Sequence, residues 1–287
     1  MPGEPEEDGA TAGGGSIGET LLALERWRPD VAFIAMHGPD GEDGRVQGAL
    51  EMLGIAYQGS GIQASAVGLD KVRTKAVYRA AGLPVAKDRV VSGRVDWRAL
   101  AAELGLPLVL KTPASGSSVG VVIATTLDEL AAQGQALVAE AGSLLCEQYV
   151  HGREFTAPVV EGPDGTPSAL PAVEIRPVTA AFFDYVAKYT PGATDELCPA
   201  PIDPVLEAEI RALGLAAHRV LGCRGYSRTD LIVRADGRPV LLETNTLPGL
   251  TAESLLPKSA AVAGLPFPAL VQRLLERARA AALSPRG

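Results

Sequence analysis

A β-hairpin between residues 226 and 245 is the strongest structural signal in this sequence. Residues 226–233 and 240–245 have the apolar and β-branched content of strands, and Asp236-Gly237 lies between them. That dipeptide is typical of a two-residue hairpin turn. Because such a turn sets the register, residues that lie opposite each other can be assigned by counting outward from it.

Four polar side chains share one face of this predicted hairpin. Counting outward places Asp230 opposite Glu243 and Arg228 opposite Asn245, and the period of two in a strand directs all four side chains to one side. Two facing carboxylates repel each other, so the pattern favours a hard cation such as Mg²⁺ between them, with Asn245 adding a neutral oxygen. A solvated face with a surface salt bridge is the plainer alternative.

Three other segments suggest a nucleotide site, and each has a plainer alternative. Lys111 ends a predicted strand, and the Gly/Ser-rich loop 112–120 could bring backbone N–H groups to phosphate oxygens, or could be only a flexible hairpin. Residues 147–154 could hold a purine and ribose, or could be only a charged strand end. The aromatic cluster 182–189 could be a lid or a local core.

Composition narrows the class of protein. The chain has 287 residues, enough for about two domains. Its net charge of -8 repels phosphate backbones, so nucleic acid is not an expected partner. The sequence shows neither a membrane-length apolar run nor a signal peptide, and its three cysteines lack metal-site or disulfide spacing. We therefore expect no membrane partner and a cytoplasmic location.

The order of predicted elements combines α/β with α+β organisation. We expect a disordered tail over 1–20, a partial α/β domain over 21–66, a central subdomain over 67–148 and a C-terminal subdomain over 149–287. The main expected elements are a strand over 31–35, helices over 70–81 and 127–140, and strands over 107–111, 119–124 and 144–150. A further helix is expected to begin at Pro204, with Asp203 as its cap. Its apolar stripe consists of Leu206, Ile210, Leu213, Ala217 and Val220.

A series of short motifs follows in a fixed order along the chain. The motifs are His37-Gly38 with Gly41-Glu42-Asp43-Gly44, Gly59-Ser60-Gly61, Asp70-Lys71, Gly116-Ser117-Ser118-Val119-Gly120, Gly152-Arg153-Glu154, Lys188-Tyr189, Cys198-Pro199-Ala200, Arg228-Thr229-Asp230, Glu243-Thr244-Asn245 and Pro248-Gly249-Leu250-Thr251. Together they resemble the motifs of the D-alanine–D-alanine ligase family, which has the ATP-grasp fold. The resemblance extends over about residues 31–278 and implies an ATP-grasp unit over about 75–279, preceded by a truncated doubly wound N-terminal domain.

The resemblance also implies a role for each candidate residue. Residues implied to bind ATP are Lys71, Lys111, Glu147, Gln148, Val150, Glu154, Phe182 and Lys188. Two Mg²⁺ ions, which Mn²⁺ could replace, would be held by Asp230, Glu243 and Asn245. The implied catalytic residues are Arg228 and Gly249, which stabilise an oxyanion, and Ser117 and Tyr189, which align substrates and close the site. Residues implied to contact the amino-acid substrates are His37, Ser254 and Leu255.

The activity that the resemblance implies is ATP-dependent ligation of two D-alanines through an acyl phosphate, for peptidoglycan precursor synthesis. D-alanine is the expected partner, and a homodimer is the assembly that the resemblance allows. Two alternatives stay open: an ATP-grasp ligase of another amino- or hydroxy-acid pair, and a nucleotide-binding module made inactive by N-terminal truncation.

The sequence departs from the family pattern at three places. The family's Gly-Gly-x-Ser-x-Glu loop has no match, because Gly14-Gly15-Ser16 is too close to His37. Thr112 and Val186 stand where the family usually has Pro and Glu. The first departure has two explanations: the chain starts at an internal Met of a longer protein, or its first segment has diverged.

Overall fold

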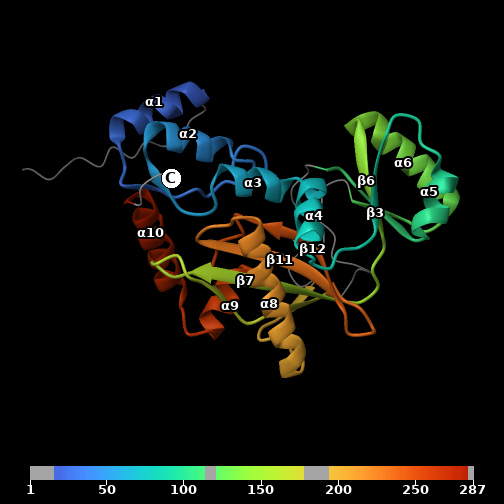
Figure 1. Ribbon diagram of the computed structural model, residues 1–287. Helices are drawn as coiled ribbons and strands as arrows, with labels where there is room; N and C mark the ends of the chain where they lie inside the picture. Colours follow the sequence, from blue (N-terminus) through green and yellow to red (C-terminus); the bar gives the residue numbers. More distant parts are fainter. Residues whose placement is uncertain (1–15, 114–120, 178–193, 284–287) are drawn as a thin grey trace, which may run out of the picture.

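The computed structural model describes residues 16–113, 121–177 and 194–283, which form three β-sheets and the helices around them (Figure 1). Within these ranges, no helix has the length and apolar character needed to cross a bilayer. The elements in chain order are α1 (Ile17–Trp27), β1 (Val31–Ala32), α2 (Arg45–Leu53), β2 (Ala56–Tyr57), α3 (Ile62–Leu69), α4 (Lys71–Ala80), β3 (Asp88–Ser92), α5 (Trp97–Leu104), β4 (Leu108–Lys111), β5 (Val122–Ala124), α6 (Leu127–Ala141), β6 (Ser143–Gln148), β7 (Arg153–Glu161), β8 (Pro167–Ala169), β9 (Val173–Pro177), β10 (Thr194–Leu197), α8 (Pro204–Val220), β11 (Tyr226–Val233), β12 (Pro239–Asn245), α9 (Leu255–Val262) and α10 (Phe267–Leu283).

The N-terminal part contains a small parallel sheet of two strands, β1 and β2. Helix α1 begins at Ile17, so the prediction of a disordered tail is wrong for residues 17–20. The helix starts there because Ser16 and Glu19 form a capping box, in which each side chain accepts a hydrogen bond from the other residue's backbone N–H. The strand predicted over 31–35 is shorter than expected, since only Val31–Ala32 pairs with a neighbour.

The central part is a four-stranded antiparallel sheet in the order β3-β6-β4-β5, with helices α5 and α6 beside it (Figure 1). The expected helix over 127–140 is confirmed as α6, and its capping box is formed by Thr126 and Glu129. Sequence analysis missed strand β3 and helix α5. The two helices pack closely, because a Cβ on Gly134 of α6 would lie 2.5 Å from the Trp97 ring of α5.

The C-terminal part is a six-stranded antiparallel sheet in the order β10-β9-β7-β11-β12, with β8 also paired to β7. Helix α8 lies against this sheet and begins as predicted: Asp203 accepts hydrogen bonds from the first-turn backbone, and Pro204 occupies the first position. Ile210 and Ala217 of its stripe are buried. The stripe ends earlier than predicted, however, because Val220 is 38% exposed.

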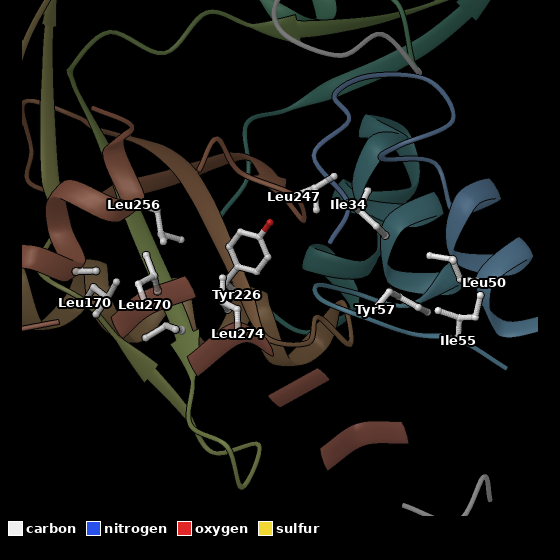
Figure 2. Packing of buried hydrophobic residues seen from close by; sticks show 12 residues of the cluster. Ile34, Leu50, Ile55, Tyr57, Leu170, Tyr226, Leu247, Leu256, Leu270 and Leu274 are labelled. Atoms are coloured by element: carbon white, nitrogen blue, oxygen red, sulfur yellow. The ribbon is translucent and has the colours of Figure 1, made fainter. Parts of the chain in front are cut away.

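A shared hydrophobic core joins the N-terminal part to the C-terminal sheet. Figure 2 shows Tyr226, the first residue of β11, at the centre of this core. Ile34 and Tyr57 approach from the N-terminal side, and Leu256 and Leu274 from helices α9 and α10. Since β11 also belongs to the predicted hairpin, this core fixes the position of the hairpin relative to the N-terminal loops.

The predicted hairpin is present, but its turn is not the one predicted. Arg234 O accepts a hydrogen bond from Gly237 N (2.9 Å), and Arg234 N donates one to Arg238 O (3.1 Å), so three residues form the loop. Gly237 has φ 81°, a left-handed conformation that is typical of three-residue hairpin loops. The expected two-residue turn is therefore wrong.

A β-bulge restores the predicted register beyond that loop. The ladder shifts by one residue between Asp230 and Leu231, because Leu231 pairs with Leu241 and leaves Leu242 as the extra residue. Beyond the bulge, Asp230 faces Glu243 as the sequence analysis expected. The predicted pairing is thus confirmed at the polar residues, although it arises from a longer loop and a compensating bulge.

Two glycine substitutions test the tight packing of the central part. Gly134→Ala places a methyl group against Trp97, and overpacking of this kind costs about 1–3 kcal/mol. That cost outweighs the gain in helix propensity, about 0.5–1 kcal/mol. Gly48→Ala in helix α2 meets only ordinary contacts, 3.6 Å or more from Ile62, so it should stabilise the protein. Urea unfolding should therefore give opposite signs for the two variants, and stabilisation by both would contradict this account.

Candidate active site

A cleft lies between the central and the C-terminal sheets. Its walls are partly apolar, from side chains that include Val109, Ile123, Ile232 and Leu242. The β-bulge contributes to this lining, since Leu242 and Glu243 are consecutive residues that both reach the cleft. The predicted site residues that line it are Lys71, Lys111, Glu147, Gln148, Val150, Glu154, Asp230 and Glu243.

Arg228 and Asp230 form a bidentate ion pair on the hairpin face. Arg228 Nε and Nη2 each lie 2.9 Å from an oxygen of Asp230, and Thr156 Oγ1 donates to Asp230 Oδ1 at 2.7 Å. Burial opposes the charge on Arg228, but Asp230 outweighs this effect and raises the pKa of the guanidinium. The arginine therefore stays charged and is held in a fixed orientation.

The other two predicted metal ligands lie on the neighbouring strand. Glu243 Oε2 is 3.2 Å from Lys71 Nζ, and Asn245 Oδ1 accepts a hydrogen bond from Leu247 N at 2.9 Å. Within the described ranges, no three His, Cys, Asp or Glu side chains form a metal cluster by themselves. The donor set of two carboxylates and one amide still suits Mg²⁺, which prefers oxygen and commonly shares its coordination with substrate phosphates.

A second charged group lies at the central-sheet side of the cleft. Glu147 is 3% exposed and contacts two lysines, Lys75 through Oε1 and Lys111 through Oε2 (2.5 Å). Burial alone would raise the pKa of Glu147, but the two lysines outweigh it and lower that pKa to about 2. In turn, Glu147 raises the pKa of Lys111 against the effect of burial. Both groups therefore stay charged at neutral pH.

Lys75 is a site residue that sequence analysis missed. It is 1% exposed and also contacts Asp88 Oδ2 at 3.0 Å. Its spacing from Lys71 was the available signal, because residues four apart lie on one face of a helix. That spacing does not show which strands the helix will contact.

A buried hydrogen-bond chain supports the hairpin from its opposite face. Tyr78 of helix α4 contacts the Thr244 hydroxyl, which lies 2.7 Å from Thr229 Oγ1. All three side chains are buried. This chain anchors α4 to both strands that carry the Arg228 and Glu243 side chains, so the helix and the hairpin form one rigid support.

The predicted substrate residues lie in two loops and at one helix start. His37 is exposed, in the loop that precedes α2. Ser254 Oγ lies 2.9 Å from Thr251 Oγ1 and close to Gly249, where a Cβ would be 3.0 Å away. Leu255 is 7% exposed and its side chain belongs to a hydrophobic cluster with Ile175. Its contact with substrate stays a prediction.

Several other predicted positions lie outside the described residues. They are Ser117, Phe182, Lys188 and Tyr189, together with Val186. Their roles stay predictions from the sequence.

Comparison with known proteins agrees with this architecture. The family model of the D-ala D-ala ligase C-terminus matches residues 77–276, and that of the D-ala D-ala ligase N-terminus matches residues 14–60. The D-alanine–D-alanine ligase of Syntrophobacter fumaroxidans is 48% identical over 263 residues, which cover 90% of this chain and 83% of that protein. The corresponding ligase of a Synechococcus species is 43% identical, with coverage of 96% and 82%.

Solved structures give the same result. The D-alanine–D-alanine ligase of Bacillus anthracis, complexed with ATP, superposes with a TM-score of 0.79 at 32% identity and covers 92% of this chain and 84% of its own. The ligase of Coxiella burnetii superposes with a TM-score of 0.77 at 30% identity, with coverage of 88% and 68%. These structures have the ATP-grasp fold. Because sequence, family pattern and fold agree along most of its length, the chain belongs to the D-alanine–D-alanine ligase family.

Proposed function

We propose that this protein joins two D-alanines into D-alanyl-D-alanine, uses ATP to do so, and supplies a precursor for peptidoglycan. The observation that carries the proposal is the composition of the cleft between the two sheets. It combines Lys71 and Lys111 with Asp230 and Glu243 of the hairpin, and Arg228 pairs with Asp230. The relatives that match most of the chain carry the same activity in their names.

ATP is proposed to bind in this cleft. Apolar side chains such as Ile232 and Leu242 offer surfaces for the purine, and Glu154 offers a carboxylate for ribose hydroxyls. Lys71 and Lys111 supply positive charge for the phosphates. The related ligase of Bacillus anthracis, whose structure was solved with ATP, supports ATP as the nucleotide.

Asp230, Glu243 and Asn245 are proposed to hold magnesium. They bring two carboxylates and an amide oxygen to one face of the hairpin. When bound there, Mg²⁺ would neutralise charge on the transferring phosphoryl group. Arg228 lies 2.9 Å from Asp230, and Lys71 lies 3.2 Å from Glu243, so both carboxylates are held in place on this face.

The reaction converts a poor electrophile into a good one. A carboxylate oxygen of the first D-alanine attacks the γ-phosphorus of ATP, ADP leaves, and an acyl phosphate forms. The neutral amine of the second D-alanine then attacks the carbonyl carbon, and phosphate leaves as the amide bond forms. Negative charge develops on the carbonyl oxygen in that second step. Arg228 and the backbone N–H of Gly249 are proposed to stabilise it.

The remaining assignments are proposals as well. Ser254 and His37 would contact the amino acids, Lys188 would contact ATP, and Ser117 and Tyr189 would align the substrates and close the site. A cytoplasmic location, a homodimer and the use of Mn²⁺ are further expectations from the sequence.

The function is tested by measuring phosphate release from ATP with D-alanine and with other amino or hydroxy acids. We expect release to depend on D-alanine, and chromatography to detect D-alanyl-D-alanine as the product. Preferential release with another acid, or release that needs no acid, would contradict the proposal.

The role of Arg228 predicts a loss of turnover with little loss of ATP affinity. Arg228→Ala should lower kcat by about 10²- to 10³-fold, because a charged donor at the developing oxyanion is lost. The KM for ATP should stay within about threefold. Arg238→Ala removes an exposed arginine of the same hairpin and serves as the control. Unchanged turnover in Arg228→Ala would remove the assigned role.

The metal site predicts a shift in magnesium dependence. Glu243→Gln keeps the shape of the side chain but removes its charge, so about tenfold more Mg²⁺ should be needed for half-maximal activity. Chelation with EDTA should stop phosphate release in the parent protein. Glu253→Gln, at an exposed position, is the control. An unchanged magnesium requirement in Glu243→Gln would place the metal elsewhere.

A further inference from the structure

Helix α4 presents two buried lysines, one turn apart, to the two sheets that form the cleft. Lys71 reaches Glu243 of the C-terminal sheet, at 3.2 Å, and Lys75 reaches Glu147 of the central sheet. The two lysines are 7% and 1% exposed. The helix therefore contacts one carboxylate on each side of the nucleotide site.

Lys75 lies between two carboxylates that face each other across a β-ladder. Asp88 of β3 and Glu147 of β6 are direct partners in the antiparallel register. Their side chains would repel each other, because like charges directly opposite destabilise a sheet. Lys75 Nζ contacts both, Asp88 at 3.0 Å and Glu147 at shorter range. Lys75 thus offsets the repulsion between Asp88 and Glu147, as a bound metal ion can do between other facing carboxylates.

The charges continue in an alternating row that ends in the cleft. Arg79, which is half-exposed, contacts Asp88; Lys75 follows, then Glu147, and finally Lys111. Lys111 and Glu147 line the cleft. Lys75 is buried behind them, so it can affect a bound nucleotide only through Glu147.

We propose that Lys75 is a positioning residue for ATP binding. Its ammonium lies between Glu147 and Asp88, keeps these two carboxylates apart, and so fixes the Lys111 ammonium where the phosphates bind. This inference rests on the proposed function only for the identity of the nucleotide. Without the Lys75 charge, Asp88 keeps only Arg79 as a cationic partner, and Glu147 keeps only Lys111. Both Glu147 oxygens can then pair with Lys111, whose charge they screen from the phosphates.

The test uses direct ATP binding and steady-state kinetics on the full chain. Lys75→Met keeps the length of the side chain and removes its charge, and we expect ATP affinity to fall about tenfold or more. The KM for D-alanine should stay within about threefold, because the effect is confined to the nucleotide side. Lys75→Arg, which keeps the charge, should retain most of the affinity.

A second substitution separates positioning from general loosening of the fold. In Lys75→Met/Asp88→Asn the opposing charge is gone, so Glu147 is no longer repelled and most of the ATP affinity should return. Lys258→Met removes another partly buried, ion-paired lysine, far along the chain near Glu196, and should leave ATP affinity unchanged. If Lys75→Met does not fold, Asp88→Asn can be compared with the double variant instead. Once Asp88 is neutral, removal of the Lys75 charge should have little further effect on ATP affinity.

Three results would overturn the proposal. One is a folded Lys75→Met variant with unchanged ATP affinity. Another is a parallel loss of ATP affinity, D-alanine affinity and turnover, which indicates general disruption. The third is a double variant that binds ATP no better than Lys75→Met. Since ATP binding is measured directly, these results stand even if the protein proves to join other acids.

Discussion

Like charges that face each other across antiparallel strands are the constraint around which this site is built. The described strands contain two such carboxylate pairs, one in each sheet that borders the cleft: Asp88 with Glu147, and Asp230 with Glu243. Both pairs would push their strands apart without positive charge nearby. Lys75 bridges the first pair. The second pair lies on the cleft, where Arg228 and Lys71 contact it and leave the face accessible to solvent. A buried lysine thus offsets the repulsion in one sheet, and the arginine and lysine beside the cleft offset it in the other.

Helix α4 supplies positive charge to both carboxylate pairs. One face of it supplies Lys71 and Lys75, and Tyr78 extends that contact to the threonines behind the hairpin. Asp70 caps the helix by accepting hydrogen bonds from Val72 N and Arg73 N, so the first lysine is held at a well-ordered helix start. Because buried charges are costly when a partner is missing, the spacing of the two sheets and the orientation of α4 depend on each other.

Much of the site could be predicted from the sequence, but for different reasons at different residues. The facing of Asp230 and Glu243 came from a strand period and a turn signal, and it is correct although the turn is wrong. Bulges have no reliable local signature, so the compensation by Leu242 could not be foreseen. The residues Lys111, Glu147 and Glu154 came from the family resemblance, and they do meet in one cleft. Lys75 was missed because its importance depends on a β3 strand that the local pattern did not reveal. The start of α1 was missed because a capping box was overlooked inside a Gly-rich segment.

The hairpin tip lies apart from the polar residues of the cleft. Strand β11 is paired with β7 along its whole length and with β12 from Arg228 to Val233, so its position does not depend on the tip. Ile232, on the tip side of the bulge, still lines the cleft, but the strands then end in an exposed loop at Asp236 and Gly237. That loop is consequently a suitable place for grafting foreign peptide into the protein, such as an affinity tag or a fluorescent reporter, without moving the residues that are proposed to act on the substrates.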